Sequence, residues 1–283
     1  MIPAQFDYVR PTTVDEALQA LRDGGDDAKL LAGGQSLLPV LRLRMADPSL
    51  IIDLNGIPEL KGVREDGDRI VVGAMTSYHD IIRHEAVQQH VTLLAQATET
   101  VADNQVRHRG TLGGSLAHAD PAGDLGAVAL ALDAELVIAG ASGTRTVPAS
   151  EFFVDYFTTA IGEGEILTEI RFPRYTGWGS HYEKFNRTAQ AWSMVAIAAA
   201  IRVEGGSIAE ARVGLTNMGT TPIRATGVEQ ALVGQPATAD AVRAAADRVT
   251  EGTAAPSDAD AAADYREHLA KVLTGRAVLA AAG

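Results

Sequence analysis

The sequence of 283 residues contains no cysteine, which excludes disulfides, thiol catalysis and cysteine-bound iron–sulfur clusters from this chain. It also lacks any run near the roughly 18 uninterrupted apolar residues that a membrane span needs. Positive charge is scarce, and the net charge of −12 argues against nucleic acid as the main partner. Any redox chemistry in this chain must therefore use a bound organic cofactor.

What remains is the composition of an ordinary soluble globular protein, with 46% hydrophobic and 21% charged residues. The length predicts about two domains. Residues 1–7 lack the basic and apolar regions of a signal peptide, so we expect a cytoplasmic protein that reaches the inner face of the membrane only through partners.

Two short glycine-rich segments carry the strongest functional signal. They are Leu31-Ala32-Gly33-Gly34-Gln35-Ser36-Leu37-Leu38 and Thr111-Leu112-Gly113-Gly114-Ser115. Adjacent glycines allow positive φ and leave no Cβ to hold a ligand away, so backbone N–H groups can close on an anion. Asp124 then starts an apolar helix whose N-terminal dipole would point back toward the second segment. Two such loops can hold one long diphosphate ligand from both sides.

The first part of the chain reads as α/β. Apolar spacing predicts helices and strands around both glycine segments. The helices are expected over residues 14–21, 40–43, 78–83 and 91–101, and the strands over residues 29–32, 50–54, 70–72, 135–139, 144–147 and 165–172.

From residue 177 the pattern changes to three strands followed by alanine-rich helices. The strands are expected over residues 182–186, 192–203 and 208–217, and the helices over residues 225–232, 239–250 and 259–282. We therefore predict an α+β protein with one domain over residues 1–176, itself split near residue 56 into subdomains 1–56 and 57–176, and a second domain over residues 177–283.

Several other functions fit the sequence less well. The Rossmann and Walker fingerprints are missing, and His84 and His90 lack the spacing of a zinc helix, so no metal site is expected. Ser115 with His118 and nearby aspartates suggests a serine hydrolase, but Ala117 stands where a nucleophile elbow has glycine. Two tight turns without a ligand remain a further possibility.

Taken together, the segments resemble one family, the flavin-binding subunits of the molybdenum hydroxylases, and most closely the branch of aerobic carbon monoxide dehydrogenase. The resemblance spans nearly the whole chain in order. It rests on residues 32–39, 105–107, 109–115, 119–121, 124, 165–170, 182–185, 187 and the threonine-rich run after Val213. It implies a two-part FAD-binding domain of the vanillyl-alcohol-oxidase (PCMH) type, followed by a three-stranded antiparallel sheet with helices.

The resemblance also implies which residues meet FAD. Asp124 would hydrogen-bond the cofactor, Leu167 would contact its ring system and Lys184 would lie near the flavin. The remaining cofactor-binding residues would be Leu31, Ala32, Gly33, Gly34, Gln35, Ser36, Leu37, Leu38, Val101, Thr111, Gly113, Gly114 and Ser115. No residue of this chain is expected to be catalytic by itself.

Trp192 is assigned to the cofactor by position. It follows residues 182–187 by one short turn and is expected to open the strand 192–203, beside Lys184. There it would cover one side of the isoalloxazine. The alternative is a core tryptophan between sheet and helices.

The partners follow from the resemblance as well. A large subunit would hold the molybdenum–pterin cofactor and a small subunit two [2Fe–2S] clusters, with the complex a dimer of heterotrimers that passes electrons to an external acceptor such as a quinone. The substrate branch is carbon monoxide, and subunits for xanthine, nicotinate or aldehyde oxidation look similar. A third possibility, beside the flavoprotein and the serine hydrolase, is an assembly subunit that kept the fold without a cofactor. Such a subunit would show neither bound flavin nor esterase activity.

Overall fold

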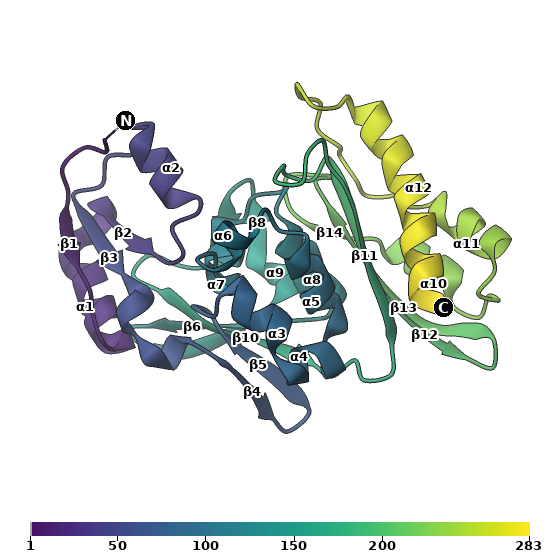
Figure 1. The fold of residues 1–283 in the computed structure, drawn as a ribbon, viewed down its shortest axis with the longest axis horizontal. Coiled ribbons are helices and arrows are strands. Elements are labelled where there is room, and N and C mark those ends of the chain that lie inside the picture. The colour runs from purple at the N-terminus through teal and green to yellow at the C-terminus, as the bar shows by residue number, and fades with distance from the viewer. Residues whose placement is uncertain (1) are drawn as a thin grey trace.

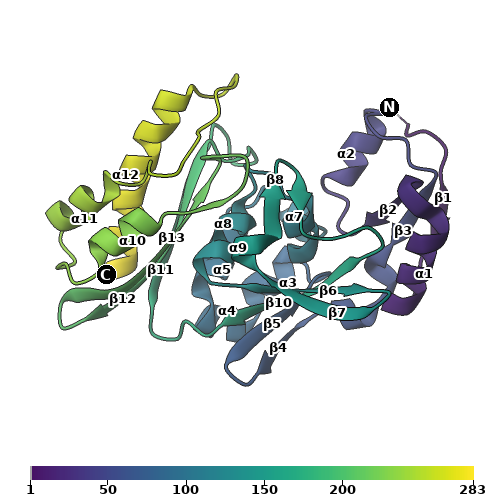
Figure 2. The same ribbon diagram turned by 180° about the vertical axis from the view of Figure 1, so that it is seen from behind.

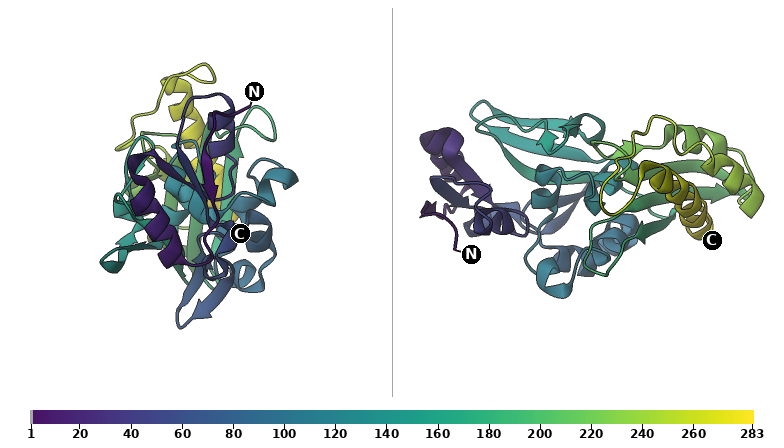
Figure 3. Two further views of the ribbon diagram at one scale, coloured as in Figure 1. Left: turned by 90° about the vertical axis from the view of Figure 1, so that its left-hand side faces the viewer. Right: turned by 90° about the horizontal axis from the view of Figure 1, so that it is seen from above.

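Three β-sheets with their helices lie in a row along the long axis of the molecule (Figure 1). The computed structural model describes residues 2–283. The first and last units lie at opposite ends, and the middle unit separates them in Figures 1 and 2 and in the right panel of Figure 3, whereas the left panel of Figure 3 looks along this axis. No helix within residues 2–283 is long and apolar enough to cross a membrane.

The first unit is a small parallel sheet covered by helix α1 (Val14–Gly24). Its strand order is β1-β3-β2, over Asp7–Val9, Leu50–Asp53 and Ala28–Leu31. The side chain of Thr13 accepts a hydrogen bond from the Glu16 backbone N–H and so caps the start of α1, which was expected over residues 14–21. The short helix α2 (Leu37–Arg42) follows β2.

The middle unit is a five-stranded antiparallel sheet with helices packed on it. The strands, in the order β4-β5-β10-β6-β7, span Val63–Asp66, Arg69–Gly73, Ile166–Pro173, Glu135–Gly140 and Gly143–Pro148. The helices α3 to α9 span Tyr78–Arg83, Glu85–His90, Thr92–Glu99, Asn104–Arg107, Leu112–His118, Asp124–Ala131 and Ala149–Phe152. A two-stranded ribbon, β8 and β9, spans Phe153–Asp155 and Thr158–Thr159.

The third unit is an antiparallel sheet with helices on its outer face (Figure 1). Its strands β11 to β14 span Gly179–Phe185, Val195–Glu204, Ser207–Thr216 and Ile223–Arg224, and its helices α10 to α12 span Thr226–Leu232, Ala239–Ala246 and Ala263–Ala282. The antiparallel sheet with helices is confirmed, and the two-residue β14 adds a fourth strand to the three expected.

Strand β12 shows how the third unit joins the middle one. Val195, Ile197 and Ile201 belong to the core under the outer helices, whereas Ala196 and Ala198 belong to the core of the middle unit. Because successive side chains of a strand point to opposite faces, the large residues fill one core and the small alanines admit a neighbour on the other face.

Helix α8 is that neighbour, and it approaches the third unit closely at two glycines. A Cβ on Gly214 of β13 would lie 2.2 Å from the Ala127 carbonyl oxygen. A Cβ on Gly126 of α8 would lie 2.5 Å from Pro222 Cγ. Both distances are too short for real atoms, so this α8 seam requires that these two positions carry no side chain.

Two local predictions are wrong. The pair Gly113-Gly114, expected in a loop, lies inside helix α7, which Thr111 caps by accepting from the Gly114 N–H at 3.1 Å. Trp192, expected to open a strand, precedes β12, because pairing with β11 starts at Phe185 and Val195. The division into domains at residue 177 stays a prediction.

Candidate functional site

A cavity of about 630 Å³ is lined by all three units of the fold. This volume lies within the range of roughly 300–1,000 Å³ typical of sites for organic ligands. Its walls come from three stretches of the chain, residues 29–54, 74–124 and 161–192. The two glycine segments, which lie about eighty residues apart in sequence, therefore face one space, as the sequence predicts.

The first wall is the turn after β2. The backbone N–H groups of Gly34, Gln35 and Ser36 donate to no protein group within residues 2–283, which leaves them available to an anion. Gly34 has a φ of +75°, a conformation that favours glycine. A Cβ on Gly33 would lie 2.2 Å from the Arg109 carbonyl oxygen, so this turn also packs directly on the second wall.

The second wall is the start of α7. Adjacent glycines were expected here because they allow positive φ, but Gly113 and Gly114 both have negative φ. They are needed instead for close packing. A Cβ on Gly113 would lie 2.5 Å from Ala74 Cβ, and one on Gly114 would lie 2.7 Å from Thr111 Oγ1. The absence of side chains thus lets α7 lie against its neighbours with its first turn at the cavity.

Tyr78 supports this wall, although no sequence signal marks it as a site residue. Its side chain is buried and lines the cavity, and its ring lies where a Cβ on Gly110 would be, at 2.5 Å. Burial raises the pKa of Tyr78 to about 12, against the opposing effect of a hydrogen bond with Ser115. The hydroxyl therefore stays protonated at neutral pH and can donate a hydrogen bond.

The third wall is built around the Asp124 carboxylate, at the start of α8. Oδ1 accepts hydrogen bonds from Tyr182 Oη and Ser193 Oγ, both at 2.7 Å, and Oδ2 accepts from Lys184 Nζ at 2.8 Å. Tyr182 and Lys184 reach it together because alternate residues of β11 share a face. We call these four residues the Asp124 cage.

The charged groups of the Asp124 cage are buried. The side chains of Lys184 and Asp124 are only 6% and 4% exposed, so their charges must satisfy each other. Burial, together with the charge of Asp124, raises the pKa of Tyr182 well above its ordinary value, so this hydroxyl remains a donor. Lys184, the cation expected near the flavin, therefore lines the cavity, but its charge is neutralised by Asp124.

Trp192 lies on the loop that closes this side of the cavity. Its side chain is 57% exposed and lines the cavity, so the alternative of a core tryptophan is wrong. Gln190 Nε2 donates to Asp103 Oδ2 at 2.6 Å and fixes the middle of the loop to the middle unit. A large aromatic face is thus presented to the cavity with little packing of its own.

The structure brings fifteen of the seventeen predicted cofactor residues to the walls. Leu31 and Leu38 do not line the cavity. Leu31 alternates with Leu30 and Ala32, which do line it, and Leu38 is 42% exposed on α2. Several lining residues were missed because nothing local marks them. They include Lys29, Leu54, Tyr78, Val106, His118, Ile161, Glu165 and Gln190.

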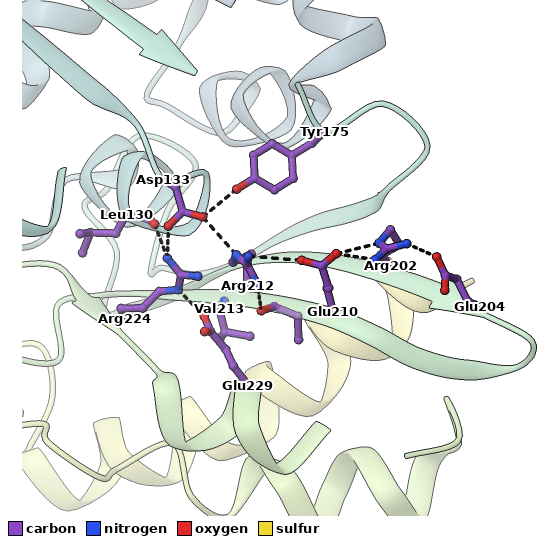
Figure 4. A network of polar contacts seen from close by, with 11 residues as sticks. Leu130, Asp133, Tyr175, Arg202, Glu204, Glu210, Arg212, Val213, Arg224 and Glu229 are labelled. Atoms are coloured by element: carbon purple, nitrogen blue, oxygen red, sulfur yellow. Dashed lines mark hydrogen bonds and ion pairs between the residues drawn. The ribbon is translucent and has the colours of Figure 1, made fainter. Parts of the chain in front are cut away.

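A second polar cluster, the Asp133 network, lies just beyond the other end of α8 (Figure 4). Asp133 Oδ2 accepts from Tyr175 Oη at 3.0 Å and from Arg212 Nε at 3.1 Å, and Oδ1 accepts from Arg224 Nη1 at 2.7 Å. Arg224 also donates to Glu229 and to the Leu130 carbonyl. Strands β13 and β14 are thereby tied to α8 at the end away from the cavity.

The hydrogen bonds of Ser115 do not support the hydrolase alternative. The hydrogen bonds found within residues 2–283 include none between Ser115 and a histidine, whereas a catalytic serine needs its base within reach. The same part of the chain holds no group of three or more potential metal-ligating side chains. The geometry instead suits a long ligand with an anionic centre and an aromatic end.

Comparison with known proteins gives matches over nearly the whole chain. Residues 4–175 match the family described as the FAD binding domain in molybdopterin dehydrogenase, and residues 180–281 match the CO dehydrogenase flavoprotein C-terminal domain.

Curated relatives and solved structures match at full length. The chain is 43% identical to the carbon monoxide dehydrogenase medium chain of Hydrogenophaga pseudoflava, over 99% of this chain and 98% of the relative. It is 38% identical to the glyceraldehyde dehydrogenase medium chain of Sulfolobus acidocaldarius, over 98% of each. A structure of carbon monoxide dehydrogenase from Hydrogenophaga pseudoflava superimposes with a TM-score of 0.96 at 44% identity, over 99% and 98% of the two chains.

Proposed function

This chain belongs to the family of FAD-binding subunits of the molybdopterin dehydrogenases, and from that premise we propose that it is the medium subunit of an aerobic carbon monoxide dehydrogenase. The observation that carries the choice of substrate branch is the 43% identity over full length to a carbon monoxide dehydrogenase medium chain. A glyceraldehyde dehydrogenase medium chain at 38% identity keeps an aldehyde as the alternative substrate.

The residues of the cavity fit FAD. Its two phosphates would meet the free N–H groups of Gly34, Gln35 and Ser36 on one side and the first turn of α7 on the other. The isoalloxazine would lie between Leu167 and Trp192, next to the Asp124 cage. Bound there, FAD supplies a group that accepts two electrons and releases them to an acceptor.

The protein's part is to bind, orient and shield the ring. The Asp124 cage offers a buried, rigid and overall neutral polar edge, whose donors are already fixed by hydrogen bonds. Leu167 and the indole of Trp192 offer apolar surfaces that keep water from the ring faces. We expect the cofactor to be held without a covalent link: the chain has no cysteine for a thioether, and the family resemblance implies no covalent attachment at His118, which lines the cavity.

The chain works with partners in this proposal. A large subunit with the molybdenum–pterin cofactor oxidises the substrate, a small subunit with two [2Fe–2S] clusters conducts the electrons, and the assembly is a dimer of heterotrimers in the cytoplasm. The absence of cysteine from this chain fits that division, since the clusters need cysteine ligands that other subunits must provide.

The experiment is anaerobic reduction of the purified complex. Carbon monoxide should bleach the flavin absorbance, whereas xanthine, nicotinate and glyceraldehyde should not. Denaturation of the same sample should release about one FAD per chain into the supernatant. Bleaching by an aldehyde or by xanthine, without a response to carbon monoxide, would assign the chain to another branch of the family, and colour that stays on the precipitate would contradict non-covalent binding.

A further inference from the structure

His118 is a half-buried residue in the wall of the cavity of about 630 Å³, which we call the flavin cavity. Its side chain is 33% exposed, and its Nε2 lies 4.0 Å from Asp120 Oδ2, which is too far for a hydrogen bond. The ring of Phe157, from the turn between β8 and β9, packs beside the imidazole with 5.1 Å between the two ring centroids. The imidazole therefore lines the cavity and can still exchange protons with water.

The position of His118 on α7 indicates which part of FAD it would meet. His118 is the last residue of this helix and lies about 9 Å along the helix axis from Leu112, in the first turn, which would meet the phosphates. Asp120 follows, and Asp120 and Trp192 together line both the flavin cavity and a smaller adjoining cavity of about 280 Å³. Since Trp192 is proposed to cover the isoalloxazine, the segment from His118 to Asp120 borders the ring side of the site.

The cations that line the flavin cavity leave a new negative charge on the ring without a nearby counter-ion. Among the lining residues of the described chain these cations are Lys29 and Lys184. Lys184 is already paired with Asp124, at 2.8 Å. Lys29 belongs to β2 in the first unit, on the side of the phosphates. Asp120, on the ring side, adds a further negative charge.

The charge of His118 can respond to the charge of the ring. Burial lowers the pKa of His118 below the ordinary 6.5, against the opposing effect of the Asp120 charge, so the imidazole is predominantly neutral at pH 7. A negative charge nearby favours the charged form of an imidazole and raises its pKa. Flavin that has gained two electrons and one proton carries such a charge, whereas the phosphates carry the same charge in both redox states. Reduction of the ring therefore favours protonation of His118.

The groups packed around the imidazole allow it to become positive. The loop after α7 brings the Asp120 carboxylate, which would attract the new charge. The turn between β8 and β9 brings the uncharged ring of Phe157, with the Tyr156 ring 4.5 Å behind it. Across the cavity, Glu165 is paired with Arg145 at 2.6 Å, and the Asp124 cage is neutral overall. These neighbours bring one unpaired carboxylate and no unpaired cation.

We propose that His118 binds a proton when FAD in the flavin cavity is reduced, and that the imidazolium so formed is the counter-ion of the reduced ring. This inference rests on the proposed function, because it requires FAD in this cavity. For each FAD, two electrons come from an iron–sulfur donor, one proton goes to the flavin, and one proton from water goes to the imidazole. FAD becomes the anion FADH⁻, a new N–H bond forms on His118, and the net charge of the site does not change.

The test counts the protons that the full chain takes up when its FAD is reduced. The chain with bound FAD is photoreduced without oxygen at pH 7, in weakly buffered solution with a pH indicator dye, and the flavin absorbance gives the amount reduced. His118→Gln removes the titrating group and keeps a polar side chain. His268→Gln is the matched control, because His268 is exposed on α12 and lines neither cavity.

The unchanged chain and His268→Gln should take up about two protons per FAD, and His118→Gln about one. The near-ultraviolet spectrum of the reduced flavin should be that of the anion in all three proteins, because the second proton is on the imidazole and not on the ring. An uptake of one proton by the unchanged chain, an uptake of two by His118→Gln, or the spectrum of neutral reduced flavin in the unchanged chain would overturn the proposal.

A second measurement needs no substitution and uses nuclear magnetic resonance of the unchanged chain with labelled histidine. The His118 signal is identified by its through-space contact with the Phe157 ring. Its titration should move to higher pH when bound FAD is reduced, whereas that of the exposed His268 should not move. A chain that binds no FAD would refute the proposed function and this proposal with it. A chain that binds FAD but whose His118 titrates alike in both redox states would refute this proposal alone.

Discussion

Asp133→Asn should destabilise the chain by about 1–2 kcal/mol at pH 7. The substitution keeps the shape of the side chain but removes the charge that pairs with Arg212 and Arg224. The Asp133 side chain is 47% exposed, so each ion pair is discounted to the roughly 0.2–1 kcal/mol of solvent-screened pairs. One weakened hydrogen bond from Tyr175 adds a fraction of about 1 kcal/mol.

The effect of Asp133→Asn on stability should depend on pH, in a direction set by the pKa of Asp133. Burial alone would raise the pKa of Asp133, but hydrogen bonds and charge from Arg224, with hydrogen bonds from Arg212 and Tyr175, lower it below the ordinary 3.8. A carboxyl group with a lowered folded-state pKa stabilises the protein above its unfolded-state pKa and loses this contribution as pH falls through the folded-state pKa. The difference between Asp133→Asn and the unchanged chain should therefore persist from pH 7 down to about the ordinary pKa of 3.8 and be lost as pH falls further, through the lowered folded-state pKa.

Thermal and urea unfolding of the purified chain measure both effects. A loss of about 1–2 kcal/mol corresponds to a fall of roughly 2–8 °C in melting temperature for a chain of this size. Asp240→Asn is the matched control, because the Asp240–Arg243 pair is 3.8 Å apart with side chains 97% and 79% exposed, and it should change nothing measurable. Equal stability of Asp133→Asn and Asp240→Asn at pH 7 would refute the assignment of the Asp133 network as a structural tie.

Three further substitutions address the cavity, and a fourth, on α12, provides a contrast to one of them. Tyr182→Phe removes one of three side-chain donors to Asp124, and it should cost about 1 kcal/mol and weaken FAD binding about fivefold in a fluorescence titration of the apoprotein; FAD affinity equal to that of the unchanged chain would separate the Asp124 cage from the cofactor. Gly113→Ala places a methyl group 2.5 Å from Ala74 Cβ and should cost about 1–3 kcal/mol by urea unfolding. In contrast, Gly275→Ala, on α12 with no atom within 4 Å of the new Cβ, should stabilise the chain by about 0.5–1 kcal/mol. Trp192→Ala should brighten the emission of bound FAD and leave the melting temperature nearly unchanged, because the indole is 57% exposed; a drop of several degrees with constant flavin emission would show a packing role instead.

The periodic elements of this fold could be predicted from the sequence because their signals are local. Helix α3 begins where Ser77 accepts from the Asp80 N–H and spans the expected residues 78–83. Strand β10, expected over residues 165–172, forms at Ile166–Pro173. Turn chemistry and the family resemblance indicate the same two glycine segments, and both segments face the cavity.

What could not be predicted depends on contacts between distant residues. Lys184 and Asp124 lie sixty positions apart, and no local pattern indicates that the lysine lining the cavity is already paired with a carboxylate. Two adjacent glycines argue against a helix, yet α7 forms because Thr111 caps it and only glycine fits against Ala74. The apolar run from Trp192 suggests a strand, but a strand starts where its partner does, at the pair Phe185 and Val195.

The α8 seam has a consequence for how such chains diverge. At Gly126 and Gly214, one part of the chain accepts the other only because a side chain is missing. A recombination crossover between Pro173 at the end of β10 and Gly179 at the start of β11 would separate each glycine from the surface that it fits. We therefore expect the parts before and after that crossover to be inherited together, and a side chain at either glycine to be tolerated only where the residues opposite leave more room.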